Sequence, residues 1–440
     1  MSSLIHGSGA FAERNARLFV YFRVLYNARA YYPILAIFFT DLGLTLDQFV
    51  MLNFIWAAAI FLLEVPSGAL ADTVGRKRLL VFASAAMVVE MSLLLFAPKN
   101  GGWVLLGVCA LNRLLSGASE AAASGADEAL AYDSLPEENR AAAWEDVLGA
   151  TMRWQSVGFL IAMSLGGLLY DPAWINQLLP AALAIPSEVA HRLPVAVVLL
   201  QAVSCLVITL RMKENRKSSA GSFRGTCRSA LGLTLATAKR AFTTRAIALV
   251  LGGGVLVDAI VRNFATLTSE YYRMMQIPDR WFGLIGSLVA VVNWFVPAVA
   301  KRVNQNTSPL GALSLAALAA MAGLAALAPA WPWFGLLPAT LLMAVLGFVS
   351  YTLSAFLNQH AAADDRATLL SVKGLVFNLG YGLWSMVFSL IVAGFRAQSG
   401  EAAFQKALQW QPLWFAGIVI PYFLSAAWLD RSRSPHGKAD

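Results

Sequence analysis

Apolar segments of about twenty residues recur along the whole chain, and this pattern most constrains what it can fold into. A helix of about 20 residues crosses the roughly 30 Å hydrocarbon core of a bilayer. Of the 440 residues, 58% are hydrophobic and 13% are charged, whereas a soluble domain is about 45–50% apolar and about 25% charged. A water-soluble core cannot hold so many apolar side chains. We therefore predict an integral membrane protein.

Twelve segments are long and apolar enough to be predicted spans. The first six are Leu18–Leu42, Phe49–Leu70, Leu79–Ala97, Trp103–Ala131, Trp144–Leu169 and His191–Leu210. The last six are Ala246–Tyr272, Trp281–Ala300, Leu310–Ala330, Trp333–Leu357, Leu369–Phe395 and Leu413–Leu429. The segments lack the alternation of a barrel, and bundled helices satisfy every backbone hydrogen bond within the bilayer. The predicted fold class is an all-α integral membrane protein with twelve helices in two six-helix bundles.

Basic residues determine the predicted topology, because loops rich in Lys and Arg stay in the cytoplasm. Placing both termini in the cytoplasm puts most basic residues there, and this topology, with contact to anionic lipids, explains the net charge of +8 without nucleic acid. The predicted domains are an N-terminal bundle (1–210), a basic linker (211–245), a C-terminal bundle (246–430) and a cytoplasmic tail (431–440). Within the linker, residues 228–242 fit either a flexible connection or an interfacial helix with cations on one face.

The sequence predicts no cofactor and no metal site. Cys109 and Cys205 lie within predicted spans and Cys227 in the linker, which gives neither a disulfide framework nor a zinc spacing. A phosphate-binding Gly-rich loop followed by Lys and Ser or Thr is missing, so the chain contains no ATP-hydrolysing motor. Residues 1–16 lack the features of a signal peptide. We expect a monomer in the inner (plasma) membrane of a bacterium.

The loop between the second and third predicted spans contains a spaced motif of five residues. Gly68, Asp72, Gly75, Arg76 and Lys77 follow the pattern Gly-x-x-x-Asp-x-x-Gly-Arg-Lys. Gly68 would allow a neighbouring helix to approach closely, Asp72 places an anion at a helix end, and Gly75 permits a tight reversal of the chain. The two cations hold the loop in the cytoplasm.

At this position the motif resembles the loop signature of the major facilitator superfamily, and the span count and two-half division extend the resemblance over essentially the whole chain. The resemblance implies a transporter and not an enzyme. In that family the loop is understood as a gate latch, which implies that Asp72 faces the start of span eleven near Leu369 and that Arg76 pairs with Asp127 or Asp133. The alternative is a basic topology determinant with a tight turn.

Polar residues in the fourth predicted span share one face of a helix. They lie at i, i+4, i+7, i+11 and i+14, and are Arg113, Gly117, Glu120, Ser124 and Asp127. A charge on a membrane helix costs about 2.5–3.5 kcal/mol, so we expect this stripe to face a wet cavity. Arg113 and Gly117 also resemble the Arg-x-x-x-Gly element of proton-driven exporters.

The fifth predicted span departs from the exporter pattern. Gly158, Gly166 and Gly167 are present, but the proline of the exporters' Gly-Pro-x-x-Gly-Gly element is missing. This weakens the efflux interpretation and leaves uptake open. The alternative role of these glycines is close packing of helices.

Other charged residues within predicted spans are candidates for coupling or for solute binding. Glu64, beside Pro66, is either a carboxylate that binds the coupling proton, alternating with a cation such as Arg113, or part of a static ion pair. Asp258 and Arg262, at i and i+4, form either a structural pair or a solute contact. Glu90 is a further deep acid. The coupling candidates are Glu64, Arg113, Glu120 and Asp127, and the substrate-cavity candidates are Asn27, Arg29, Arg153, Asp258, Arg262 and Tyr381.

These patterns predict a secondary active transporter that moves a small organic solute by alternating access. Protons are the expected coupling ion and membrane lipids the expected surroundings. Efflux of a drug or metabolite is the first interpretation. The alternatives are proton-coupled uptake of a nutrient or metal chelate, a lipid translocator, and a sensor with this fold that moves nothing.

Overall fold

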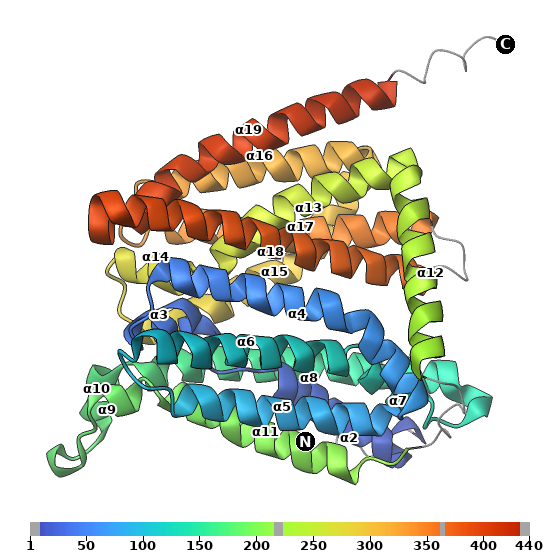
Figure 1. The fold of residues 1–440 in the computed structure, drawn as a ribbon, viewed down its shortest axis with the longest axis horizontal. Coiled ribbons are helices and arrows are strands. Elements are labelled where there is room, and N and C mark those ends of the chain that lie inside the picture. Colours follow the sequence, from blue (N-terminus) through green and yellow to red (C-terminus); the bar gives the residue numbers. More distant parts are fainter. Residues whose placement is uncertain (1–8, 215–222, 361–365, 432–440) are drawn as a thin grey trace. The chain divides into compact units, whose positions relative to one another are not determined.

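The computed structural model describes residues 9–214, 223–360 and 366–431, and this described part of the chain contains helices and no strand. The α-helices of the first part are α2 (Arg14–Asn27), α3 (Leu35–Asp41), α4 (Leu46–Thr73), α5 (Arg76–Leu95), α6 (Gly102–Ala123), α7 (Ala126–Tyr132), α8 (Arg140–Tyr170), α9 (Pro172–Leu178), α10 (Ser187–Ala190) and α11 (Leu193–Arg211). Those that follow are α12 (Phe223–Thr243), α13 (Arg245–Thr266), α14 (Thr268–Met274), α15 (Arg280–Asn306), α16 (Pro309–Leu327), α17 (Leu336–His360), α18 (Arg366–Ser399) and α19 (Ala403–Arg431) (Figure 1).

Each of the twelve predicted spans overlaps at least one of these helices, which is consistent with the predicted fold. Within the described residues, nine segments have the length and apolar character of a membrane span, and ten if the pair α8 and α9, bent by 89°, counts as one. The count stays below twelve because α18 and α19 lie within one of the nine, 368–429, and because the first predicted span is interrupted.

Three predicted spans are interrupted in the structure, namely the first, the fourth and the seventh, in which Leu267 separates α13 from α14. The first consists of α2 and α3 separated by the 3-10 turn Tyr32–Ile34, where Pro33 removes a backbone donor. The fourth ends at Ala123, and Gly125 adopts a left-handed conformation with φ of +73° before α7 begins. Because of this second break, Ser124 and Asp127 do not continue the helical face of Arg113, and the predicted five-residue stripe is wrong beyond Glu120.

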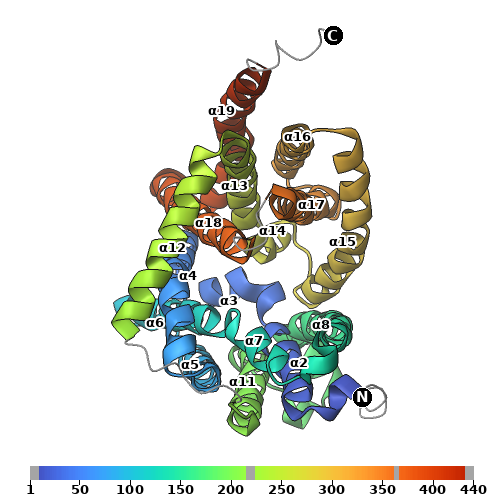
Figure 2. The same ribbon diagram turned by 90° about the vertical axis from the view of Figure 1, so that its right-hand side faces the viewer.

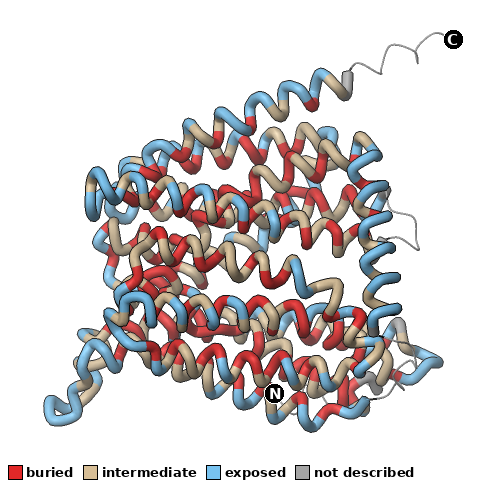
Figure 3. Tube along the Cα trace, viewed as in Figure 1, coloured by how far each residue is buried: buried red, intermediate tan, exposed pale blue. Residues whose placement is uncertain are grey.

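The chain forms two compact units, each containing a short exchanged piece. The first unit comprises the described residues of Met1–Thr45, Ile55–Gly232 and Pro278–Ser287, and the second those of Leu46–Phe54, Leu233–Ile277 and Leu288–Asp440. In the first unit α5 packs between α6 and α11; in the second α13 packs against α16, α17, α18 and α19 (Figures 1 and 2). Buried residues follow the packed faces, and α12, within the predicted linker, is a largely exposed helix (Figure 3).

Specific contacts account for the exchanged pieces. In the second unit, Asp47 at the start of α4 pairs with Arg396 of α18, with 3.0 Å between Oδ1 and Nε, and the Asp47 carbonyl accepts a hydrogen bond from the Ser389 hydroxyl. In the first unit, Arg280 at the start of α15 lies 3.6 Å from the Asp171 carboxylate, which follows α8. These contacts attach each helix start to a helix distant in the sequence.

The glycines of α8 serve close helix packing, as the alternative interpretation of the sequence predicts. A Cβ on Gly158 would lie 2.8 Å from Val24 Cγ1, and one on Gly166 would lie 1.8 Å from the carbonyl oxygen of Ala30. Gly167 faces the backbone of α15, where a Cβ would lie 2.8 Å from the Gly283 nitrogen. The Val24 side chain at Gly158, and neighbouring backbones at Gly166 and Gly167, thus occupy the space of the missing side chains.

We expect Gly166→Ala to lower the free energy of unfolding by about 1–3 kcal/mol, because an added methyl group must displace backbone. Gly107→Ala in α6 is the matched control, since no atom lies within 4 Å of its Cβ position and alanine favours a helix. Thermal unfolding of the purified protein in detergent measures both. Equal Tm values for the two variants would contradict this packing account.

Candidate functional site

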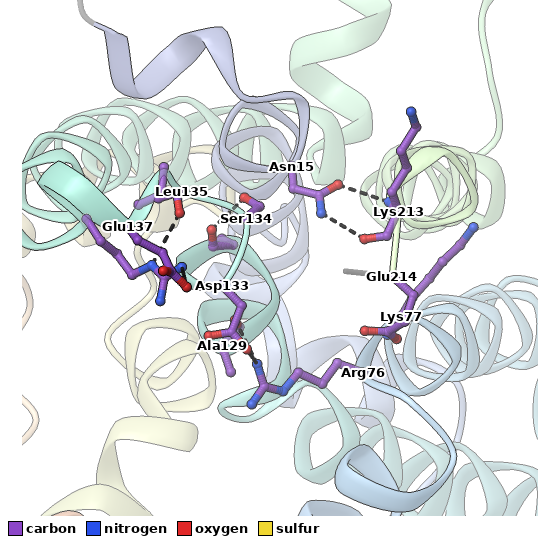
Figure 4. A network of polar contacts seen from close by, with 12 residues as sticks. Asn15, Arg76, Lys77, Ala129, Asp133, Ser134, Leu135, Glu137, Lys213 and Glu214 are labelled. Atoms are coloured by element: carbon purple, nitrogen blue, oxygen red, sulfur yellow. Dashed lines mark hydrogen bonds and ion pairs between the residues drawn. The ribbon is translucent and has the colours of Figure 1, made fainter. Parts of the chain in front are cut away.

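The loop between α4 and α5 forms a network of polar contacts (Figure 4). Arg76 Nη1 lies 2.6 Å from Asp133 Oδ2 and donates a hydrogen bond to the Ala129 carbonyl. Of the two partners that the family resemblance implies for Arg76, the structure therefore forms the pair with Asp133. The Lys77 backbone N–H donates to Glu214 Oε2, which connects the loop to the residues after α11. Arg76 thereby fixes the start of α5 against the end of α7.

The two glycines of the motif differ in their surroundings. Gly75 has a φ of +112°, and a Cβ there would lie 2.9 Å from Glu214 Oε2, so the predicted reversal needs glycine. Gly68 is exposed and no atom lies within 4 Å of its Cβ position, so the predicted close helix approach is wrong at Gly68. The expectation that Asp72 faces the start of span eleven remains a prediction.

Asp127, in the first turn of α7, forms a separate ion pair within the first unit. Its Oδ2 is 2.9 Å from Arg23 Nε, and the Arg23 guanidinium also contacts the Glu128 carboxylate. The Asn27 side chain donates a hydrogen bond to the Arg23 carbonyl, which stabilises this turn of α2. These residues join α2 to α7. The structure thus separates Asp127 and Asn27 from the deeper charged side chains.

A charged cluster is buried in the first unit between α2, α5 and α6. Arg29 Nη1 lies 2.9 Å from Glu90 Oε1, and the two residues are 2% and 0% exposed. The Arg29 guanidinium also lies over the Tyr26 ring, 5.3 Å from its centroid. We call this the Arg29–Glu90 cluster, and it comprises Tyr26, Arg29, Glu90, Arg113 and Ser116.

The cluster extends along α6. Arg113 is 6% exposed, and its guanidinium lies over the Phe39 ring, 4.7 Å from the centroid. Arg113 interacts electrostatically with Glu90, and Ser116 on the same helix lies near that carboxylate. The Glu90 carboxylate is therefore paired with Arg29 and lies within electrostatic range of a second buried arginine.

Gly117 is explained by helix packing. A Cβ on it would lie 2.6 Å from Ala59 Cβ and 2.7 Å from the Trp56 carbonyl oxygen, so α4 and α6 approach closely there. The contact places Arg113 one turn away from this crossing, beside Glu90. A structural reason for glycine thus exists whatever the direction of transport.

Three further predicted site residues of the first unit lie outside this cluster. Glu64 is half-buried in α4, and its carboxylate forms no ion pair within the described residues; in particular, it does not contact Arg113. Arg153 is exposed on α8. Glu120 is half-buried on α6 and interacts electrostatically with Glu90. The sequence predicts that Glu64 is the acid that interacts with Arg113. In the structure Glu90 is that acid.

A second charged cluster lies in the second unit between α13 and α18. Arg262 Nη2 is 2.8 Å from Asp258 Oδ2, which forms the i, i+4 pair expected from the spacing. Arg262 Nη1 donates to Asn378 Oδ1 at 3.3 Å, and the guanidinium centre lies 5.8 Å from the Phe377 ring and 5.7 Å from the Tyr381 ring. We call these five residues the Asp258–Arg262 cluster.

Hydrogen-bond donors without partners lie on the same two helices. In the described part of the chain, the buried Asn263 Nδ2 and Trp384 Nε1 atoms have no acceptor. Lys373, one turn before Phe377, donates to Ser354 Oγ of α17 at 2.8 Å. The facing sides of α13 and α18 therefore offer a cation, a carboxylate, amides and aromatic rings to a bound molecule.

A comparison of the sequence with models of protein families identifies the family of this chain. The sequence model of the Major Facilitator Superfamily matches residues 17–385. The chain belongs to the major facilitator superfamily. Its fold and family make it a transporter and not an enzyme. No curated protein sequence matches the chain.

Solved structures of superfamily transporters share this fold. The nucleoside transporter NupG is 14% identical, with a TM-score of 0.70, and the match covers 95% of this chain and 98% of that chain. A D-xylose-proton symporter is also 14% identical, with a TM-score of 0.62 over 94% of this chain and 95% of that chain. A bacterial homologue of the lysosomal transporter Spinster is 17% identical, with a TM-score of 0.64 and coverage of 98% and 100%. At these identities the likeness shows the fold alone.

Removing one member of the buried pair tests its energetic role. Arg29→Met should lower the free energy of unfolding by about 3–5 kcal/mol, because it leaves the Glu90 carboxylate buried without its ion pair. Arg153→Met on the exposed face of α8 is the matched control and should change stability by less than about 1 kcal/mol. Thermal unfolding of both variants in detergent gives the comparison. If Arg29→Met were as stable as Arg153→Met, the pair would not hold α2 to α5.

Proposed function

We propose that the chain is a secondary active transporter that couples proton movement to the transport of a small organic solute by alternating access. The observation that carries the proposal is the buried Arg29–Glu90 cluster, with Glu90 0% exposed beside two arginines. Charges within membrane helices are costly and mark ion or substrate pathways. A packed scaffold would be more stable with apolar residues at these positions.

Glu90 is the proposed proton-binding group. Arg29 pairs with its carboxylate and Arg113 interacts with it electrostatically, and each of these cations favours the charged form of the acid. A conformational change that withdraws either cation would favour protonation, and return of the cation would release the proton. Glu64, one of the coupling candidates from the sequence, has no cation paired with it among the residues that the structure describes.

The Asp258–Arg262 cluster is the proposed contact for the solute. Arg262 and Asp258 neutralise each other, and Lys373, which interacts electrostatically with both and lies 5.7 Å from the Phe377 ring, adds a cation beside the pair. Phe377 and Tyr381 offer ring faces, and the unpaired donors of Asn263 and Trp384 offer hydrogen bonds to acceptors on the solute. A molecule with an apolar ring and carbonyl or hydroxyl oxygens matches these groups.

Efflux is the proposed direction, because Arg113 and Gly117 resemble the exporter element, and uptake is the alternative. The packing contact that explains Gly117 weakens this argument, and the proton symporter among the structural neighbours shows that the fold also serves symport. The loop of Asp72 and Arg76 is proposed as a gate latch. We also propose a monomer in a bacterial inner membrane with both termini in the cytoplasm.

Substrate-dependent pH change inside proteoliposomes tests coupling. A panel of nucleosides, sugars, lipophilic cations, organic acids and metal chelates is added to wild-type vesicles, and the sign of the change gives the direction. We expect Glu90→Gln to abolish the solute-driven pH change, because the amide cannot bind and release a proton. Exposed Glu145→Gln is the matched control and should retain it.

Glu64→Gln separates the two candidate acids. The proposal expects Glu64→Gln to retain a solute-driven pH change that Glu90→Gln loses. The opposite result would assign the proton to Glu64, and a normal pH change in both variants would contradict coupling through either acid. Expression and Tm of each variant confirm that the protein is folded.

A further inference from the structure

A groove with only apolar lining lies within the second unit, between α15, α16 and α17. Its volume is about 390 Å³, and all twelve lining residues are Val, Leu, Ala or Phe. It uses α15 only from Val292 onward, the part of this helix that belongs to the second unit. An apolar cavity of about 150 Å³ already stays free of water and takes up small apolar molecules. A larger groove of the same kind should hold an apolar guest.

The groove exists because α15 packs incompletely against its neighbours. Within the most apolar 18-residue stretch of α15, only 22% of the residues are buried. This is the smallest fraction among the nine candidate spans of the described chain. Pro297 lies inside α15 and removes a backbone hydrogen bond beside the groove. Figure 2 shows this helix alongside α16 and α17. Phe295 and Val299 are 65% and 54% exposed, so the groove opens on the surface of the unit.

A cation marks one end of the groove. Phe295, Val299 and Arg302 follow at i, i+4 and i+7, so Arg302 extends the face of α15 that lines the groove. Arg302 and its neighbour Lys301 are exposed, and neither forms an ion pair within the described residues. A guanidinium presents donors that match the oxygens of a phosphate. The same face therefore offers an apolar channel and then an anion-binding group.

We propose that this groove binds one acyl chain of an anionic phospholipid of the surrounding bilayer, with the lipid phosphate at Arg302. The apolar lining fits the hydrocarbon chain, and the position of Arg302 fits a headgroup at the end of a membrane helix. A polar solute would find no hydrogen bond in the groove, because all of its lining residues are apolar. This inference is independent of the solute and of proton coupling.

Photochemical labelling in vesicles tests the site. The full-length protein is placed in phosphatidylcholine vesicles that contain a tracer of either phosphatidylglycerol or phosphatidylcholine with a diazirine in its acyl chain. After illumination, peptide mass spectrometry locates the adducts. We expect the phosphatidylglycerol tracer to label the groove residues of α15–α17 about fivefold more than the phosphatidylcholine tracer does, because one cation near the membrane surface supplies about that preference.

Two pairs of variants assign the chain and the headgroup separately. Ala319→Phe fills the groove and should remove the labelling, whereas Leu318→Phe, on the adjacent exposed face of α16, should leave it unchanged. Arg302→Gln should abolish the preference for phosphatidylglycerol, and Lys239→Gln on α12 should not. If Ala319→Phe is not folded, Ala319→Leu replaces it. Labelling spread evenly over exposed helices, or equal labelling by both tracers, would overturn the proposal.

Discussion

The cost of placing charge inside a bilayer is the constraint on which the rest of this structure depends. Each charged side chain at the centre of a membrane helix costs several kcal/mol unless it is paired. The first unit pairs Arg29 with Glu90, and the second pairs Asp258 with Arg262. Glu90, Asp258 and Arg262 lie on helices, Arg29 lies in the segment after α2, and each pair has an aromatic ring beside its arginine. The charges of these two pairs are thereby neutralised inside their units.

Glycine and proline positions shape the helices that hold these clusters. Gly117 lets α4 and α6 approach closely one turn from Arg113, and Gly158 and Gly166 bring α8 against α2 and the turn after it. The interruption of the first predicted span between Asn27 and Leu35 places Arg29 in a non-helical segment, from which its side chain reaches Glu90 on α5. A continuous helix through residue 29 would aim that side chain differently. The break is therefore part of the arrangement that buries the pair.

Much of the fold could be predicted from the sequence, because each predicted span contains enough apolar residues to identify it locally. The loop motif and the i, i+4 spacing of Asp258 and Arg262 are also local, and the structure forms both the Arg76–Asp133 and the Asp258–Arg262 pairs. Glu90 and Arg29 are 61 positions apart, and no spacing rule connects them. The stripe from Arg113 to Asp127 failed beyond Glu120 because Gly125 ends the helix, and Gly68 met no neighbour.

The double variant Arg29→Met with Glu90→Met tests the central claim most directly, because it removes both charges of the buried ion pair at once. Stability and solute-driven pH change are measured on the same preparation in proteoliposomes, together with exchange of labelled solute. If Glu90 carries the proton, the double variant regains part of the Tm that Arg29→Met loses, since only Arg113 of the cluster keeps its charge, and it still exchanges solute but produces no pH change. A double variant that is stable and still moves protons with its solute would show that the pair is structural and would contradict the account.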